Sequence, residues 1–292
     1  MPHINVPPPD LLDQLRTRKL ITGSVQFEPL FGGRTNMVWK VLGESGDTVL
    51  KLYRNKLRNP MFRNDAHLEA LCLRAFEQDG FVPRLQATGQ HQGDAWVLYD
   101  HAPGRPWESG TAQVASLLRK LHGSTVDLPL PSGRNGSADL ARHGAELLAL
   151  CSSSLRDRVT AMRPEDPVPP TKRTCLIHGD PVAGNILVDG SNLTLIDWQC
   201  PAIGDPCEDL ALFLSPAMQH LYHGAPLAPD ERARFLTEYG DPETVTRYDA
   251  LQPWYAWRMA AYCLWRSENG STDYEKGLQL ELKALEDRAI SE

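Results

Sequence analysis

The sequence is poor in the features that mark disulfide-rich, metal-binding or membrane-spanning proteins. Its six cysteines are scattered, no CxxC pair occurs, and no spacing of cysteine and histidine resembles a zinc site. In a chain of 292 residues we expect such cysteines to be reduced thiols, which favours the cytoplasm. No run of about 18 apolar residues occurs and the N-terminus has no apolar signal core, so the sequence predicts no membrane span.

The sequence also contains fewer basic than acidic residues. Lys and Arg number 30 against 37 Asp and Glu, which gives a formal net charge of −7. Nucleic-acid binding depends on basic side chains that neutralise phosphates, so this balance disfavours nucleic acid as a partner. An acidic protein tolerates or mildly attracts cationic small molecules. The hydrophobic content of 41% is that of a folded protein of one or two domains.

The pattern of the chain changes near residue 103. Before it, short β-branched or aromatic runs between turns predict an antiparallel β-sheet with one helix over 64–78, the strands lying at 24–30, 36–42, 48–53, 83–88 and 95–99. After it, helical patterns prevail, except for a hairpin predicted around Asp189-Gly190. The order predicts an α+β protein of two lobes, with residues 1–102 as the N-lobe and 103–292 as the mostly helical C-lobe.

The segment 175–209 concentrates the residues that carry chemistry. It contains an HGD motif that ends at Asp180, then Asn185, then Asp197 in the run LIDW. Four residues separate Asp180 from Asn185, which is the spacing of a kinase catalytic loop. In such a loop the aspartate meets the acceptor hydroxyl and the asparagine binds metal. The predicted hairpin returns the chain so that Asp197 can reach the same Mg²⁺ ion.

This set of motifs, HGDxxxxN with a downstream IDW and the run GDPCEDLA at 204–211, resembles the aminoglycoside phosphotransferase and choline kinase superfamily. The resemblance covers roughly residues 25–265 and implies a two-lobed protein-kinase-like fold that uses ATP and Mg²⁺. It implies Asp180 as the catalytic base and Asn185 and Asp197 as the magnesium ligands. It also implies that Asp209 anchors the catalytic loop, while His178 is expected to pack and hydrogen-bond within it.

The resemblance extends to two segments of the N-lobe that would contact the nucleotide. A glycine-containing turn between two predicted strands would let backbone N–H groups approach the phosphates. The interlobe hinge of the family would contact adenine through its backbone. The matching residues are Gly32, Gly33, Thr35 and Asn36 in the turn, and Asp100, His101 and Ala102 in the hinge.

A lysine and a glutamate complete the implied nucleotide site. Lys51 lies on a predicted strand and resembles the family's lysine that pairs with the α- and β-phosphates. Glu69, on the following helix, resembles the acid that pairs with this lysine. Asp65 and Glu77 are the alternatives to Glu69 on the same predicted helix.

The acceptor is predicted from two further patterns. The run GGRTN at 32–36 resembles the loop of the choline, ethanolamine and thiamine kinase branch. A helix predicted over 252–266 carries Trp254, Trp257 and Tyr262, whose faces would hold an ammonium group if they do not simply pack in the core. The predicted function is therefore ATP-dependent phosphotransfer to a small hydroxyl-bearing molecule such as choline or ethanolamine.

Two groups of alternatives stay open at this point. An aminoglycoside, thiamine, a sugar or homoserine could replace the amino alcohol as the acceptor on the same fold. A nucleotide-binding protein without catalysis is the alternative from another class, although the presence of Lys51, Asp180, Asn185 and Asp197 together disfavours it.

Overall fold

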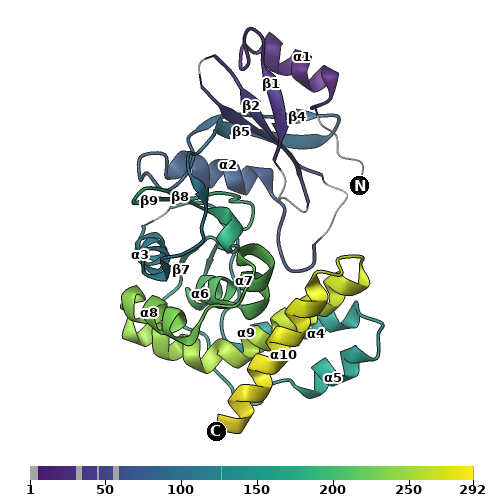
Figure 1. The fold of residues 1–292 in the computed structure, drawn as a ribbon, viewed down its shortest axis with the longest axis vertical. Coiled ribbons are helices and arrows are strands. Elements are labelled where there is room, and N and C mark those ends of the chain that lie inside the picture. The colour runs from purple at the N-terminus through teal and green to yellow at the C-terminus, as the bar shows by residue number, and fades with distance from the viewer. Residues whose placement is uncertain (1–5, 31–34, 45, 55–58, 126, 292) are drawn as a thin grey trace. The chain divides into compact units, whose positions relative to one another are not determined.

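The computed structural model divides the chain into two compact units (Figure 1). It describes residues 6–30, 35–44, 46–54, 59–125 and 127–291. Unit 1 contains Met1–Arg105 and Leu187–Cys200, and unit 2 contains Pro106–Ile186 and Pro201–Glu292. The sequence prediction divided the chain after residue 102 and put all later residues in one lobe. In the structure, the hairpin segment packs with the N-terminal unit instead.

Unit 1 is built on a five-stranded antiparallel sheet with the strand order β1-β2-β3-β5-β4. The central strand is β3, and Lys51 on it lies opposite Val38 of β2 and Val97 of β5. The strands are β1 (Gln26–Pro29), β2 (Met37–Leu42), β3 (Thr48–Leu52), β4 (Leu85–His91) and β5 (Asp94–Asp100).

The two faces of this sheet carry different helices (Figure 1). Leu50 and Leu52 pack into a hydrophobic cluster with Leu11 of α1 (Pro9–Thr17). Side chains alternate between the faces of a strand, so Lys51 points to the opposite face. There it meets α2 (Ala66–Ala75). On one face of the sheet, the apolar side chains of β3 therefore pack against α1. On the opposite face, the Lys51 ammonium points towards α2.

The sequence offers Asn64 and Asp65 as caps for helix α2, and the helix is capped by Asp65. The Asp65 carboxylate accepts hydrogen bonds from the N–H groups of His67 and Leu68, which satisfies two of the unpaired donors at the helix start. Asp65 is therefore engaged as a cap and is not the acid that pairs with Lys51.

The predicted hairpin is present as β8 (Ile186–Asp189) and β9 (Asn192–Leu195). Gly190, in the turn, has φ of +60°, a conformation that glycine adopts at little cost. The short strand β6 (Arg105–Pro106) lies beside β8 and completes a three-stranded sheet. The hairpin returns the chain from the end of the catalytic loop to Asp197.

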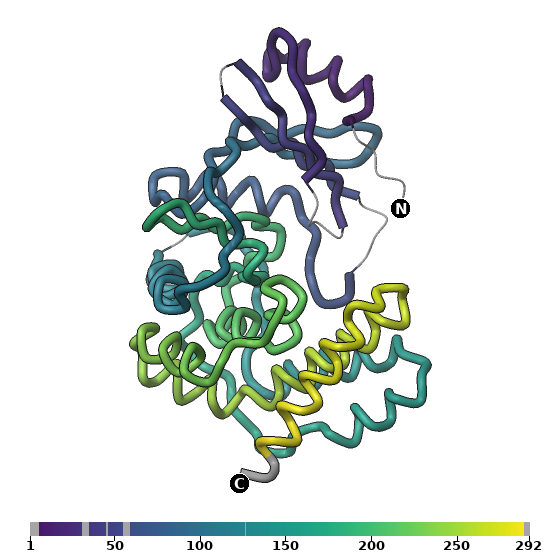
Figure 2. Tube along the Cα trace, in the orientation of Figure 1, coloured from purple at the N-terminus to yellow at the C-terminus, as the bar shows by residue number. Residues whose placement is uncertain are grey.

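Unit 2 is mostly helical and is arranged around one long helix, α9 (Pro242–Glu268), as the trace in Figure 2 shows. Helices α4, α5, α6 and α10 all contact α9. The remaining helices are α3 (Thr111–His122), α4 (Ser137–Ala149), α5 (Leu155–Ala161), α6 (Cys207–Leu214), α7 (Pro216–His223), α8 (Pro229–Tyr239) and α10 (Tyr274–Ser291).

Two small strands in unit 2 had no signal in the sequence pattern. β7 (Cys175–Ile177) and β10 (Ala202–Gly204) form an antiparallel pair that brackets the catalytic segment. Three residues are too few for a recognisable alternation. The helical pattern that begins at Asp139 predicts one helix extending towards Met162, but the structure forms two separate helices, α4 and α5.

The fold class is confirmed as α+β, with an antiparallel sheet unit and a helical unit. Among the described residues, no helix combines the length and the apolar character needed to cross a membrane. The six cysteines are free thiols.

We expect Gly144→Ala to destabilise the protein by about 1–3 kcal/mol, because a Cβ at this position of α4 would lie 2.2 Å from the ring of Trp257. Helix propensity alone favours alanine over glycine by about 1 kcal/mol, so the steric effect must reverse the sign. The free energy of unfolding in urea measures the change. Exposed Glu146→Ala on the same helix is the control, and a Gly144→Ala protein as stable as the wild type would contradict the packing.

Candidate active site

A buried cluster of three charged side chains lies in unit 1. The Nζ atom of Lys51 lies 2.7 Å from Oε2 of Glu69 and also pairs with the carboxylate of Asp197. The side chains of Lys51 and Glu69 are 3% and 1% exposed, whereas that of Asp197 is 24% exposed. The structure thus selects Glu69 among the acids that the sequence offered. Asp197 is the member of the cluster that reaches solvent.

The charges of this cluster shift the pKa values of Lys51 and Glu69. Burial by itself lowers the pKa of Lys51, but the negative charges of Asp197 and Glu69 reverse this and raise the pKa above its ordinary range. Burial raises the pKa of Glu69, and the Lys51 ammonium opposes that shift. The hydroxyl of Tyr53 donates to the same oxygen of Glu69. Sequence reasoning missed Tyr53, although its position two residues after Lys51 puts both on one face of the strand.

The backbone at Asp197 is held in an unusual conformation. Its φ is +65°, in the left-handed region that few residues other than glycine adopt. Trp198 fixes the segment, since its ring packs against Phe76 and Phe81 at centroid distances of 6.0 and 6.3 Å. The indole N–H of Trp198 also donates to the carbonyl of Leu195 at 2.9 Å. Such local strain persists only where the surroundings enforce it, and it clusters at functional sites.

The predicted phosphate-binding turn is described only in part. Gly32 and Gly33 lie outside the described residues, and Thr35 lies in the bend that precedes β2. The amide of Asn36 exchanges hydrogen bonds of 2.7 and 2.9 Å with Asn64, and it donates to Gln199 at 3.0 Å. The Asn36 side chain therefore ties the start of β2 to the segment after Asp197. A nucleotide contact in this turn stays a prediction.

The predicted adenine-binding segment follows directly from β5. The carboxylate of Asp100 accepts from Arg84 at 2.8 Å, and the N–H of Asp100 donates to the Arg84 carbonyl at 2.9 Å. The N–H of His101 donates to the carbonyl of Asp47 at 2.9 Å. Ala102 comes next along the chain. These bonds hold the segment in place, and its contact with adenine stays a prediction.

In unit 2, Asp180 and Asn185 lie side by side on the catalytic loop. Asn185 belongs to the short 3-10 helix η1 (Ala183–Asn185), and its Nδ2 donates to the carbonyl of Asp180 at 2.8 Å and to Oδ2 of Asp180 at 3.3 Å. Because Asn185 uses its nitrogen for both contacts, its oxygen is the atom suited to coordinate a cation. Oxygen is the ligand that Mg²⁺ prefers.

Taken separately, the two segments each offer an oxygen of the kind that Mg²⁺ takes as a ligand. Asn185 offers an amide oxygen, and Asp197 offers a partly exposed carboxylate. Among the described residues, no three or more His, Cys, Asp or Glu side chains converge to hold a metal ion. Mg²⁺ usually takes one or two protein carboxylates and completes its shell with water and phosphate oxygens.

The catalytic loop is anchored by Asp209 in the first turn of α6. This side chain is fully buried, and its two oxygens accept the N–H groups of His178 and Gly179, each at 2.8 Å. Gly179 has φ of +80°, which only glycine adopts readily and which turns the chain before Asp180. The N–H of Asp180 in turn donates to Nδ1 of His178 at 3.2 Å. The structure agrees with the anchoring role that the resemblance implies for Asp209.

The aromatic residues predicted to hold the acceptor are packed in the interior of unit 2. Trp254, Trp257 and Tyr262 are 4%, 1% and 2% exposed. The indole N–H groups donate to the carbonyls of Asp166 and Val159 at 2.9 and 2.7 Å. The structure gives these rings the core role that the sequence left as an alternative. Their contact with an acceptor stays a prediction without structural support.

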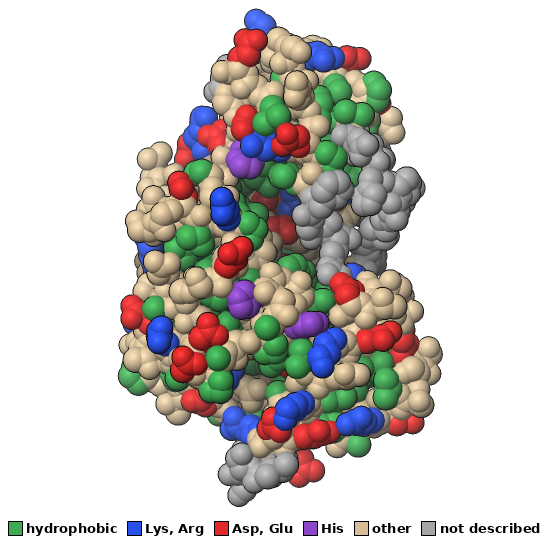
Figure 3. Space-filling view, viewed as in Figure 1, with side chains coloured by type: hydrophobic (Ala, Val, Ile, Leu, Met, Phe, Trp, Pro, Cys, Tyr) green, Lys and Arg blue, Asp and Glu red, His purple; other side chains and the backbone are tan. Residues whose placement is uncertain are grey.

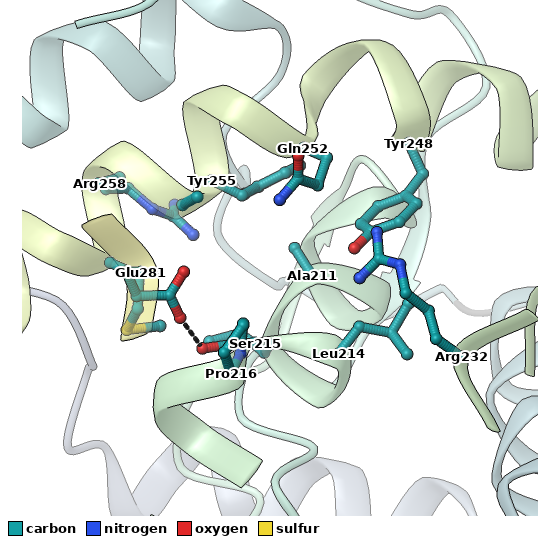
Figure 4. A pocket seen from close by; sticks show the side chains of 13 residues that line it. Ala211, Leu214, Ser215, Pro216, Arg232, Tyr248, Gln252, Tyr255, Arg258 and Glu281 are labelled. Carbon is teal, nitrogen blue, oxygen red and sulfur yellow. Dashed lines mark hydrogen bonds between the residues drawn. The ribbon is translucent and has the colours of Figure 1, made fainter. Parts of the chain in front are cut away.

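A small cavity lies among α6, α8, α9 and α10 (Figure 4). Its volume is about 20 Å³, which suits about one water molecule. The Glu281 carboxylate faces it and accepts hydrogen bonds from the Ser215 hydroxyl at 2.5 Å and the Ala217 N–H at 3.1 Å. Burial raises the pKa of Glu281 to about 7. The cavity is too small for an acceptor molecule.

A wider groove of about 450 Å³ opens on the surface of unit 2. It lies between α7 and the start of α10, which pack together. The residues that line it are His220, Leu221, Thr272, Asp273, Glu275, Lys276 and Gln279. On the face of the molecule in Figure 3, acidic and basic side chains are interspersed over each unit.

These two units together define a class of protein. An antiparallel sheet that buries a lysine–glutamate pair, and a helical unit that carries an aspartate–asparagine loop, are the parts of a protein-kinase-like phosphotransferase. The phosphotransferase enzyme family matches residues 26–254, and the chain belongs to that family. The resemblance that the motifs carry is thereby confirmed.

Individual relatives agree with this assignment. An aminoglycoside 3′-phosphotransferase of Niallia circulans is 24% identical over 253 residues, which cover 76% of this chain and 94% of that protein. The crystal structure of a choline/ethanolamine kinase family protein from Mesorhizobium loti has a TM-score of 0.62 at 18% identity, and the match covers 95% of this chain and 94% of that chain. A spectinomycin phosphotransferase, solved with ADP and spectinomycin, has a TM-score of 0.64 at 15% identity, with coverage of 96% and 99%.

We expect Lys51→Met to lower the free energy of unfolding by about 3–5 kcal/mol, because it leaves the Glu69 carboxylate buried without its cation. The double variant Lys51→Met/Glu69→Gln should regain part of this loss, since the amide carries no charge. Urea denaturation measures both. Lys40→Met is the control, because Lys40 pairs at 2.8 Å with the more exposed Asp47 and such pairs contribute about 0–1 kcal/mol. Equal losses for the two lysines would argue against the buried pair.

The stability of the protein should also depend on Glu281. Its pKa is about 7 in the folded chain against an ordinary 4.5, so the native state binds more protons between these values. The stability that the protonated Glu281 contributes is fully present below the ordinary pKa of a glutamate. It is lost as pH rises through about 7. Glu281→Gln should therefore raise the melting temperature more at about pH 8.5 than at about pH 5. A pH-independent difference, or the same profile in exposed Glu275→Gln, would contradict the assignment.

Proposed function

We propose that this phosphotransferase moves the γ-phosphate of ATP to the hydroxyl of a small molecule that also carries a positively charged nitrogen. An amino alcohol such as choline or ethanolamine is the simplest acceptor of this kind. The observation that carries the proposal is the buried Lys51 ammonium, held by Glu69 beside the partly exposed Asp197. A lysine placed in this way is suited to bind the phosphates of a nucleotide.

In the proposed reaction, unit 1 supplies the groups that hold ATP. Lys51 binds phosphate oxygens, while Glu69 and Tyr53 keep its ammonium in place. Gly32 and Gly33 would donate backbone N–H groups to the phosphates, and the 100–102 segment would contact adenine. Nucleotide binding is supported by the spectinomycin phosphotransferase of the same fold, which was solved with ADP.

Unit 2 supplies the group that orients the acceptor. Asp180 accepts a hydrogen bond from the acceptor hydroxyl and takes its proton as the oxygen attacks the γ-phosphorus and ADP leaves. Asn185 donates to Oδ2 of Asp180 and so fixes the direction of that carboxylate. Asn185 and Asp197 would hold Mg²⁺, which when bound neutralises charge on the transferred phosphoryl group.

A nitrogen-bearing acceptor is supported by the charge of the protein and by its relatives. The net charge of −7 attracts cations. The relatives include an aminoglycoside phosphotransferase and a choline/ethanolamine kinase family protein. The aromatic helix no longer favours choline, since its rings are buried. An aminoglycoside is therefore the second candidate, and the sequence relative favours it.

An acceptor screen tests this proposal. The purified protein is incubated with Mg·ATP and a panel of amino alcohols, aminoglycosides, thiamine, sugars and homoserine, and ADP release is followed by a coupled assay. We expect turnover with a compound that contains both a hydroxyl and a charged nitrogen. Turnover only with uncharged sugars would overturn the acceptor class. ATP binding without transfer to any acceptor would favour a nucleotide-binding protein without catalysis.

When measured with an acceptor that the wild type phosphorylates, Asp180→Asn should lower kcat by on the order of 10²–10⁴-fold. It should leave the affinity for ATP largely unchanged. The amide keeps the shape of the side chain but cannot take a proton. Asp189→Asn is the matched control, because Asp189 is an exposed residue at the end of β8. Wild-type kcat in Asp180→Asn would refute the role of Asp180 as the base.

A further inference from the structure

We propose that His122, supported by Tyr239, is a positioning residue for the catalytic loop. Its imidazole holds the Asp209 carboxylate, and this carboxylate fixes the peptide groups that precede Asp180. The catalytic part of this proposal rests on the proposed function, in which Asp180 is the base. Nothing in the sequence motifs marks His122, which ends α3 and lies 87 residues before Asp209.

The first step of the argument is the number of donors around Asp209. Its Oδ2 accepts from the N–H of His178 at 2.8 Å and from Nε2 of His122 at 3.1 Å, while Oδ1 accepts from the N–H of Gly179. A buried carboxylate is costly unless hydrogen bonds replace its hydration. Two of these three donors are backbone N–H groups of the loop, and the third is the side chain of His122. The hydrogen bond from His122 therefore does not depend on the conformation of the loop itself.

The second step is the state of the imidazole. A carboxylate can only accept, so Nε2 of His122 carries the hydrogen that faces Asp209. On the other side of the ring, Nδ1 lies 2.8 Å from the hydroxyl of Tyr239 at the end of α8. The guanidinium of Arg119 hydrogen-bonds to the same hydroxyl, so this hydroxyl is free to donate its own hydrogen to Nδ1. The chain of donors thus runs in one direction, from Arg119 through Tyr239 and His122 to Asp209.

The third step connects this chain to Asp180. The peptide N–H groups of His178 and Gly179 are held by Asp209, and the N–H of Asp180 is held by His178. The side chain of His122 is 4% exposed, so Asp209 receives this hydrogen bond from the protein interior and not from bulk solvent. Without it, the carboxylate would turn towards another donor and move the peptides with it. Small displacements of a catalytic group, on the order of 1 Å, reduce turnover by as much as about 10²-fold.

Two variants of His122 separate positioning from packing. In His122→Asn the shorter amide can reach Tyr239 but not Asp209, whereas the amide nitrogen of His122→Gln can take the place of Nε2. We expect His122→Asn to lower kcat by on the order of 10²-fold with KM for ATP and acceptor nearly unchanged. His122→Gln should recover most of that loss. His143→Asn is the matched control, because His143 is 3% exposed in α4 of the same unit and outside this network.

A second measurement does not depend on activity. Amide hydrogen exchange at His178 and Gly179 should be faster in His122→Asn than in the wild type, and unchanged in His143→Asn. If the wild type transfers phosphate to no acceptor, the proposed function fails, but the exchange rates still decide whether His122 holds the loop. Tyr239→Phe, which removes a single oxygen, provides a milder variant and should shift kcat and exchange in the same direction to a smaller extent.

The proposal is overturned by any of three results. These are unchanged exchange at both amides in His122→Asn, a kcat loss no greater than that of His143→Asn, or a loss in His122→Gln as large as that in His122→Asn. The third result would mean that the ring acts through its shape and not through the hydrogen bond to Asp209. If His122→Asn does not fold, Tyr239→Phe decides the question. A wild-type kcat together with wild-type amide exchange at His178 and Gly179 in Tyr239→Phe overturns the proposal.

Discussion

The pairing of the buried Lys51 ammonium with Glu69 and Asp197 is the constraint on which unit 1 depends. An unpaired buried charge is strongly unfavourable, so the three side chains must stay together whatever the rest of the sheet does. Lys51 comes from the central strand, Glu69 from α2, and Asp197 from the segment after β9. The same requirement therefore fixes three elements that are distant in sequence. It also leaves a partly exposed carboxylate beside a fixed cation.

In unit 2, the carboxylates at the start of α6 are likewise paired, either with arginines or with backbone N–H groups. Asp205 pairs with Arg247 at 2.8 Å, Glu208 pairs with Arg258 at 2.6 Å, and Asp209 accepts the backbone of the catalytic loop. Acidic residues in the first turn are favoured by the helix dipole. Each one reaches a different neighbour, so this short helix fixes both the loop and the long helix α9. Arg258 is itself buried in α9.

The aromatic side chains of α9 that the sequence suggested for the acceptor are buried in unit 2. The rings of these residues fill the core, and the indole N–H groups of Trp254 and Trp257 donate to backbone carbonyls. Trp and Tyr at helical spacing more often pack than bind, and the close approach of Trp257 to Gly144 is an example. The open groove between α7 and α10 is lined by both acidic and basic side chains.

The sequence by itself determined the strands of the sheet, the family and the catalytic motif, because alternation, turn residues and the HGDxxxxN spacing are local properties. Tertiary structure alone decided which acid meets Lys51, since Asp65, Glu69 and Glu77 share one predicted helix and only packing selects the face. It also decided that the rings of α9 are buried, and that His122 and Tyr239 converge behind Asp209. Hydrogen bonds between residues 87 and 117 positions apart leave no periodic signal in a single sequence.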